Sequence, residues 1–288
     1  MTEVPLVDLH LHSTASDGIF SPKDIVRLAK EGGLSLIALT DHDTTAGVAE
    51  AQAEGKRVGI DVVAGVEISL DFPRGTFHMI GLFIDPDDRD LIAALAELRE
   101  SRDLRNRGLV ERLGKIGLPV DLDEVTAHAG GEVVARPHFA RAMIARGYVG
   151  TNQEAFDLYL ARGRPAYVER TRLSGADAIS FVHAAGGVAV LCHPFTLELN
   201  DAALLAFARE QAAEGLDAME VIYSTRDPAR EAIRRRIATE AGLLESGGSD
   251  FHGHTKKDRR AGLKARNLRI PIEVAHALRA RAAKRTGH

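Results

Sequence analysis

Short apolar runs alternate with helical patterns along most of the chain. Seven runs have the length and apolar content of buried strands: residues 4–12, 34–40, 62–70, 76–84, 188–193, 218–224 and 243–249. Helical patterns follow several of them. One covers residues 21–30, an Ala-rich one follows the second strand and ends near residue 56, and two more cover residues 201–214 and 228–240. Ser21 and Pro22 begin the first helix as N-cap and first position, and Gly32-Gly33 ends it. About seven strands with intervening helices predict a barrel-like α/β fold.

The middle of the chain breaks this alternation. Between Asp90 and about Arg164, apolar residues keep helical spacing and no segment has the pattern of a strand. Four helices are expected there, at residues 90–116, 121–129, 136–146 and 153–162. We therefore interpret residues 90–164 as a helical insertion over the mouth of a barrel formed by residues 1–89 and 165–288.

The composition is that of an ordinary globular protein, with 288 residues of which 45% are hydrophobic. Thirty-seven Lys and Arg residues against 41 Asp and Glu residues give a net charge of −4. This balance gives no support to bulk binding of duplex DNA or of an anionic membrane. A small phosphorylated substrate needs only a local basic pocket, which the average charge does not exclude.

The only cysteine is Cys192, so neither an internal disulfide nor a cysteine-based zinc site is expected. The first residues lack the basic and apolar regions of a signal peptide, and the apolar runs are too short to cross a bilayer. These features predict a cytoplasmic protein. The oligomeric state cannot be predicted from them.

Residue types that bind metal ions recur where the predicted strands end. Nine of them are candidate ligands: His10, His12, Asp17, His42, Glu67, His78, His193, Asp250 and His252. His10 and His12 are two apart on a strand, so both rings point to one face with Cα atoms about 6.5–7 Å apart. Loops that follow the strands of an α/β barrel build the active site at one face. One such histidine would more often be structural, but six histidines and three carboxylates at the same structural point predict a metal cluster.

The chemistry of these side chains narrows the choice of metal and reaction. Imidazole and carboxylate without thiolate suit Mn²⁺, Fe²⁺ or Zn²⁺. Ions of this kind lower the pKa of bound water, toward about 7 for zinc, and polarise a phosphoryl oxygen. The sequence has no Gly-rich P-loop, so nucleotide hydrolysis of that type is not indicated.

Six motifs, in order along nearly the whole chain, resemble those of the PHP superfamily, named for polymerase and histidinol phosphatase. They are residues 8–13, 16–18, 40–43, 65–69, 193–194 and 248–252. The resemblance implies a distorted (β/α)₇ barrel that holds up to three divalent ions, with Mn²⁺ favoured. It implies one ion on His10, His12, Glu67 and Asp250, a second on Asp17, His42 and His252, and a third that Glu67 bridges with His78 and His193. Asp41 and Asp43 are expected to orient histidines.

Within the superfamily the chain is most similar to nucleoside 3′,5′-bisphosphate phosphatases and 5′→3′ exoribonucleases. The similarity lies in the helical insertion, in His138-Phe139-Ala140-Arg141, and in residues 159–163 and 167–168. It implies substrate-phosphate contacts by Arg102, Arg105, Arg136 and His138. Arg102 and Arg105 are three apart on one predicted helix face, and guanidinium binds phosphate in a bidentate way. The alternative is a solvated basic face, because Arg99, Arg107 and Arg112 are also nearby.

One departure concerns the segment after His193. Relatives often continue His-Pro with Gly-Arg-Tyr, whereas this chain has Pro194-Phe195-Thr196. An arginine that could contact substrate is therefore missing.

These features predict a metal-dependent phosphatase for phosphomonoesters of small nucleotides, with nucleoside 3′,5′-bisphosphates such as pAp as the leading substrates. A metal-bridging hydroxide is expected to attack phosphorus in line, and His254 is the only protein group considered as acid. The main alternative is a 5′→3′ exoribonuclease that trims short 5′-phosphorylated RNA. An aromatic content of 5% and the absence of Trp argue mildly against a channel that stacks bases.

Two further alternatives are histidinol phosphate hydrolysis and an inactive metal-binding regulatory module. The second requires lost ligands, and all nine candidates are present. His128, His183, His276 and His288 fall outside the motifs and are expected to be structural or surface residues. The basic run from Ala275 to Arg285 is interpreted as a solvated terminal helix.

Overall fold

The computed structural model describes residues 5–73, 75–129, 133–223, 227–253 and 268–287. Eight strands lie in these ranges: β1 (Leu6–Leu11), β2 (Leu34–Leu39), β3 (Asp61–Leu70), β4 (Phe77–Leu82), β5 (Val188–Leu191), β6 (Ala218–Tyr223), β7 (Leu244–Gly248) and β8 (Ile270–Pro271). All seven predicted strands are therefore present, and β8 is an addition that sequence patterns did not show.

The strands form one sheet in the order β7-β6-β5-β4-β3-β2-β1-β8. β1, β2 and β3 are parallel neighbours, and so are β5, β6 and β7. β4 runs antiparallel to both β3 and β5, because it forms a hairpin with β3 and has no crossover helix before it. β8 pairs antiparallel with β1.

The sheet curls until the segment after β7 meets β1. Asp250 N donates to His10 O at 3.0 Å, and His12 N donates to Phe251 O at 3.1 Å. Gly248 allows this approach, because a Cβ there would lie 2.1 Å from His10 Cβ. The result is a nearly closed barrel, which confirms the predicted α/β fold class.

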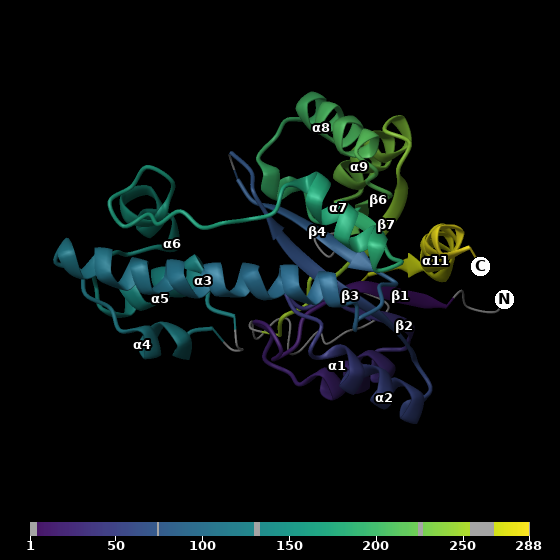
Figure 1. Ribbon diagram of the computed structural model, residues 1–288, viewed down its shortest axis with the longest axis horizontal. Helices are drawn as coiled ribbons and strands as arrows, with labels where there is room; N and C mark the ends of the chain where they lie inside the picture. The colour runs from purple at the N-terminus through teal and green to yellow at the C-terminus, as the bar shows by residue number, and fades with distance from the viewer. Residues whose placement is uncertain (1–4, 74, 130–132, 224–226, 254–267, 288) are drawn as a thin grey trace.

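The predicted helices that flank the barrel are present, and α7 is an addition. The helices around the barrel are α1 (Pro22–Glu31), α2 (Val48–Val58), α7 (Gly175–Ala184), α8 (Asp201–Ala213), α9 (Pro228–Glu240) and α11 (Ile272–Thr286). Ser21 caps α1 by accepting from Asp24 N, and Pro22 occupies the first turn as expected. Figure 1 shows α1 and α2 on one side of the sheet and α8 and α9 on the other.

All the regular elements among the described residues of the expected insertion are helical. The insertion contains α3 (Arg89–Lys115), α4 (Leu122–Ala127), α5 (Arg136–Ala145), α6 (Asn152–Ala155) and the π-helical turn η1 (Phe156–Leu160). α3 belongs to both parts of the molecule, because Leu91, Leu95 and Leu98 pack into the barrel core while Leu109 and Leu113 pack into a separate cluster. Figure 1 shows α3 extending from the barrel to carry α4, α5 and α6.

The C-terminal run forms the predicted helix, α11, but the interpretation that it is merely solvated is wrong. Ala275, Leu278 and Ala282 of α11 are buried in the barrel core. Arg285 binds Asp217, which is 1% exposed, with one N–O distance of 2.8 Å. A charge-rich stretch can thus hide one apolar stripe that anchors the helix. In the described part of the chain, no helix is long and apolar enough to cross a membrane.

Candidate metal centre and substrate pocket

The ends of the strands bring the candidate ligands to one rim of the barrel. His10 lies in β1 and His12 directly after it, His42 follows β2, and His193 follows β5. Glu67 and His78 instead lie within β3 and β4, which extend beyond the rim as a hairpin. The nine predicted residues fall into overlapping groups whose candidate ligand atoms lie within 4.8 Å of one another.

The first group contains His10, His12, Glu67 and Asp250, the same four residues that the resemblance implied. The Nε2 atoms of His10 and His12 are 3.1 Å apart. Glu67 Oε2 lies 3.2 Å and Asp250 Oδ1 lies 3.3 Å from His12 Nε2. Four donor atoms of four residues thus face one small volume.

The second group contains Asp17, His42 and His252, and it also includes His12. Asp17 Oδ1 is 3.1 Å from His252 Nε2 and 3.7 Å from His12 Nδ1. His12 therefore lies between the two groups, with one ring nitrogen toward each.

The third set of ligands that the resemblance implied, Glu67, His78 and His193, falls into two groups that share Glu67. His78 Nδ1 and His193 Nε2 each lie 2.8 Å from Glu67 Oε1. His78 groups with Glu67 and His42, whereas His193 groups with Glu67 and Cys192. Cys192, for which the sequence predicted no metal-binding role, donates its thiol to the same oxygen at 3.4 Å.

Unpartnered polar atoms show that these residues fit metal ions. Within the described ranges, His12 Nδ1, His42 Nδ1 and Glu67 Oε2 are buried and have no hydrogen-bond partner. His42 Nδ1 and Glu67 Oε2 are 3.1 Å apart without the alignment of a hydrogen bond. Buried polar atoms are costly without partners, so lone pairs that converge in this way suit a shared cation.

The charges of the cluster set opposite protonation states on neighbouring histidines. Burial alone would lower the pKa of His12, but the carboxylates of Asp250 and Glu67 raise it to about 10. Burial lowers the pKa of His42 to about 3, against the opposing charges of Glu67 and Asp17. His42 is therefore ready to donate a lone pair, whereas a metal ion must displace a proton from His12.

The residue that orients two of the histidines is Glu220, which sequence patterns missed. Its Oε1 lies 2.9 Å from His10 Nδ1, and its Oε2 accepts from His193 N at 2.6 Å. Thr196 Oγ1 lies 3.1 Å from His193 Nδ1, so the Nε2 atom of that ring faces Glu67. A glutamate inside the apolar strand β6 was the available signal, because a buried acid needs a partner.

The hypothesis that Asp41 and Asp43 orient histidines is wrong. Asp41 accepts hydrogen bonds from the hydroxyls of Ser13 and Ser16, at 2.7 and 2.6 Å. Asp43 accepts from Ser69 N at 2.9 Å and from the guanidinium of Arg102. Both acids therefore fix the loops around the cluster, because each also accepts from a backbone N–H of another segment, Ser13 N for Asp41 and Ser69 N for Asp43.

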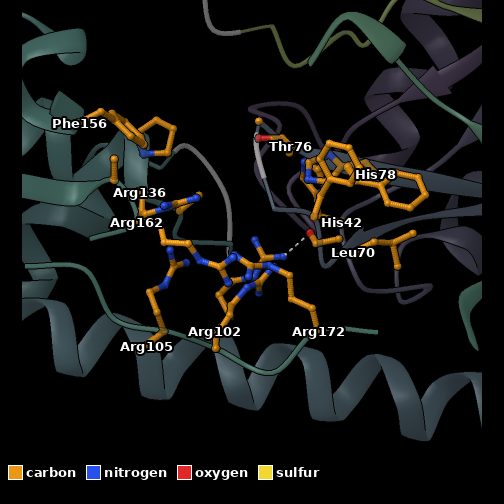
Figure 2. A pocket seen from close by; sticks show the side chains of 18 of the residues that line it. His42, Leu70, Thr76, His78, Arg102, Arg105, Arg136, Phe156, Arg162 and Arg172 are labelled. Atoms are coloured by element: carbon orange, nitrogen blue, oxygen red, sulfur yellow. Dashed lines mark hydrogen bonds between the residues drawn. The ribbon is translucent and has the colours of Figure 1, made fainter. Parts of the chain in front are cut away.

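One pocket of about 970 Å³ connects the ligand cluster to the insertion. His42, His78, Asp17, Asp250 and His252 line one part of it. Seven arginines are among its other lining residues: Arg102, Arg105, Arg136, Arg141, Arg162, Arg170 and Arg172. Figure 2 shows Arg136, Arg162 and Phe156 on one side, His42 and His78 on the other, and Arg102 and Arg172 between them.

Two of these guanidiniums have no ion-pair or hydrogen-bond partner among the described residues. They are Arg105, which is 6% exposed, and the half-buried Arg170. Burial and the charge of Arg102 lower the pKa of Arg170 to about 9. Burial and the charges of Arg170 and Arg102 also lower the pKa of Arg105 well below its usual range. Like charges held together in a pocket suit an anionic ligand.

The two interpretations of the basic helix each fit part of α3. Arg107 and Arg112 are exposed, as a solvated face requires. Arg102 and Arg105 are buried and line the pocket, where the substrate-phosphate contacts that the resemblance implies stay a prediction. Arg170 and Arg172 were missed, although their alternate spacing in an extended segment places both side chains on one face.

The remaining candidate contacts come from α5 and its neighbours. His138 lines the pocket and accepts from Ala135 N through Nδ1 at 3.0 Å, so it also caps α5. The guanidinium carbon of Arg136 lies 5.6 Å from the Phe156 ring centre and 5.8 Å from that of Tyr167. His254, the candidate acid, lies outside the described residues.

Of the histidines outside the motifs, His183 pairs with Asp217 at 2.9 Å, and His276 is exposed on α11. His128 ends α4, and its carbonyl accepts from Arg141 at 3.0 Å. These three fit the expected structural or surface roles, and His288 lies outside the described residues.

Comparison with known proteins agrees with this geometry. A model of the PHP domain matches residues 8–128. The chain is 37% identical to a 5′-3′ exoribonuclease of Haemophilus influenzae, over 85% of this chain and 89% of the relative. It is 35% identical to the 3′,5′-nucleoside bisphosphate phosphatase of Chromobacterium violaceum, over 89% and 90% of the two chains.

A solved structure from Bifidobacterium adolescentis, assigned as a metal-dependent phosphoesterase, has a TM-score of 0.77 with this chain. The identity is 30%, over 97% of this chain and 98% of that one. A barrel with histidines and carboxylates at one rim, beside an arginine-lined pocket, is the arrangement that a metal-dependent phosphoesterase needs. The chain belongs to the PHP family, and it is a metal-dependent hydrolase of phosphoric esters.

Proposed function

We propose that this enzyme hydrolyses phosphomonoesters of small nucleotides and that its preferred substrates are nucleoside 3′,5′-bisphosphates such as pAp. One observation carries the proposal: a single pocket is lined by the ligand cluster and by seven arginines. A substrate with two phosphates could place one at the cluster and the other among the arginines. The 35% identity to a phosphatase for such bisphosphates supports the same substrate class.

The nine candidate ligands are proposed to hold up to three divalent ions, with Mn²⁺ favoured and Fe²⁺ or Zn²⁺ as alternatives. Bound ions would activate water as the nucleophile and neutralise charge on the phosphoryl oxygens. Glu67 has two oxygens that face different histidines, so it is the proposed bridge. Glu220 and Thr196 hold the rings of His10 and His193 in fixed orientations.

The arginines are proposed to hold the phosphate that is not hydrolysed. Arg102 is fixed by Asp43 and by Ser69 Oγ, which is 3.1 Å away. Arg105 and Arg170 lack such partners in the described ranges, so their donors remain available to a ligand. A phosphate bound there would form charge-assisted hydrogen bonds and would fix the scissile group at the cluster. Residues 90–164 would thus act as a substrate-binding insertion.

A second candidate is trimming of 5′-phosphorylated RNA from its 5′ end. The lining of the pocket favours this candidate. Phe156 and Tyr167 line the pocket beside Arg136, and a nucleotide base can stack on such a combination. The 37% identity to a 5′-3′ exoribonuclease also favours it. The inactive-module alternative has no comparable support. A cytoplasmic location remains a prediction from composition.

The two candidates are separated by giving the metal-loaded enzyme pAp and a 5′-phosphorylated oligoribonucleotide in parallel. Bisphosphate hydrolysis predicts release of inorganic phosphate from pAp with the higher kcat/KM. A higher kcat/KM for the oligoribonucleotide, with stepwise release of mononucleotides, would reverse the assignment. Failure to hydrolyse either compound would refute the proposed substrate class.

The anion-binding part of the proposal is tested with Arg170→Met and with Arg107→Met as a matched control on the exposed face of α3. Loss of a charge-assisted hydrogen bond costs about 1.5–3 kcal/mol, which corresponds to roughly 10- to 100-fold in kcat/KM for pAp. Hydrolysis of p-nitrophenyl phosphate, which has one phosphate, should change much less. Equal losses on both substrates would refute selective binding of the second phosphate.

A further inference from the structure

Cys192 lies directly after β5 and one residue before His193, where its side chain reaches the ligand cluster. It is 1% exposed, and its Sγ is 3.4 Å from Glu67 Oε1. The same oxygen is 2.8 Å from His193 Nε2. The candidate ligand atoms of Glu67, Cys192 and His193 all lie within 4.8 Å of one another. This spacing suits three ligands of one ion.

The backbone at His193 makes this arrangement available. Consecutive side chains of a strand point to opposite faces, so Cys192 and His193 would normally diverge. His193 instead has φ 28° and ψ 61°, a left-handed conformation that is costly for a residue with a Cβ. His193 N donates a hydrogen bond of 2.6 Å to Oε2 of Glu220, which lies in β6, and this bond stabilises the strained backbone at His193. Both side chains therefore reach Glu67.

The alternative role for Cys192 is that of a small buried residue with a weak S–H bond to Glu67. The surroundings of the sulfur favour a ligand. Glu67 is 0% exposed, and its Oε1 also lies 2.8 Å from His193 Nε2, so Cys192 Sγ shares its partner atom with a candidate metal ligand. Burial and the charges of Glu67, Glu220 and Asp250 raise the pKa of the free thiol, so a thiolate there requires a bound cation to balance the negative charge.

We infer that Cys192 Sγ joins Glu67 and His193 as a ligand of one divalent ion, with the thiol proton released to solvent. The inference rests on the proposed metal centre and goes beyond its nine nitrogen and oxygen ligands. A thiolate favours softer ions, so this position should prefer Zn²⁺, Fe²⁺ or Co²⁺ over Mn²⁺ and Mg²⁺. The centre would then hold unlike ions, or ions of one kind bound with unequal affinity.

Cobalt spectroscopy of the full chain tests this directly. The protein is stripped of metal and titrated with Co²⁺ while its visible and near-ultraviolet absorption is recorded. Ligation by Cys192 predicts a sulfur-to-cobalt charge-transfer band in addition to the visible d–d bands. Because the chain has one cysteine, only Cys192 can produce the band.

The Cys192→Ser variant should lose the charge-transfer band, keep the d–d bands, and bind one Zn²⁺ at least about tenfold more weakly. Ser246→Ala, at another buried small residue of the barrel, is the control and should leave the band unchanged. If the wild-type protein binds Co²⁺ with d–d bands and no charge-transfer band, the inference is overturned while the metal centre stands. If the wild-type protein binds no Co²⁺, both the inference about Cys192 and the proposed metal centre are refuted. The wild-type spectrum decides even if a variant does not fold.

Discussion

At the scale of single residues, Glu67 connects the groups of candidate ligands. Its Oε1 contacts His78 and His193, and its Oε2 lies 3.2 Å from His12 and 3.1 Å from His42. A carboxylate can serve two ions in this way because each oxygen has its own lone pairs. Loss of its charge should therefore affect more than one ion at once.

The Glu67→Gln variant should lose activity by at least about 100-fold and should release two ions together, because an amide offers one oxygen where the carboxylate offers two. Phosphate release from pAp and metal content by mass spectrometry measure the two effects. A variant with full activity and a full metal complement would refute the bridging role.

Glu220 supports the centre without belonging to the predicted ligand set. It holds the ring of His10 and the backbone of His193 through different oxygens. Glu220→Gln keeps the size but cannot accept at both positions, so metal affinity should fall by about 10- to 100-fold. Glu245→Gln, on β7 and paired with Arg235, is the control and should bind metal normally. Equal affinities in the two variants, measured by competition with a chelating dye, would show that Glu220 has no such role.

At the scale of elements, the sequence predicted the positions of the strands better than it predicted their directions in the sheet. Apolar runs located β1 to β7, since buried strands need them, and ligand-type residues at their ends located the rim. The antiparallel course of β4 was predictable but was not stated, because the short connection between β3 and β4 leaves no room for a crossover helix. α11 was misread because its charged residues outnumber the three buried ones that fix it.

The closure of the barrel depends on Gly248. A Cβ there would lie 2.1 Å from His10 Cβ, so Gly248→Ala should push β7 away from β1 and destabilise the fold by about 1–3 kcal/mol. Urea unfolding measures this change. Gly114→Ala in α3 is the control, because its Cβ meets nothing within 4 Å and should stabilise the helix by up to about 1 kcal/mol. Destabilisation of the two variants by the same amount would contradict a specific role for Gly248.

At the scale of the whole molecule, average charge hides where charge lies. The chain has a net charge of −4, yet seven arginines line one pocket and the carboxylates gather at the ligand cluster beside it. Ligand-type residues at the strand ends predicted the nine candidate ligands, and the family resemblance predicted Arg102 and Arg105. Glu220 and Arg170 each had a local signal, but their roles depend on contacts with segments distant in sequence, which a local pattern does not determine.

The separation of charge makes the stability of the whole protein depend on metal and on pH together. Ions that bind only the folded state should stabilise it, by about 2.7 kcal/mol when the free ion is at 100 times its dissociation constant. Without metal, the carboxylates raise the pKa of His12 to about 10, so protonated His12 stabilises the apoprotein, fully below its unfolded pKa and less as pH rises through about 10. Metal must displace this proton. The rise in melting temperature on adding Mn²⁺ to chelator-treated protein should therefore be larger at about pH 8 than at about pH 6. Calorimetric scans at both pH values, with and without metal, measure it. A metal-induced rise that is equal at both, or larger at the lower pH, would show that binding releases no proton from the cluster.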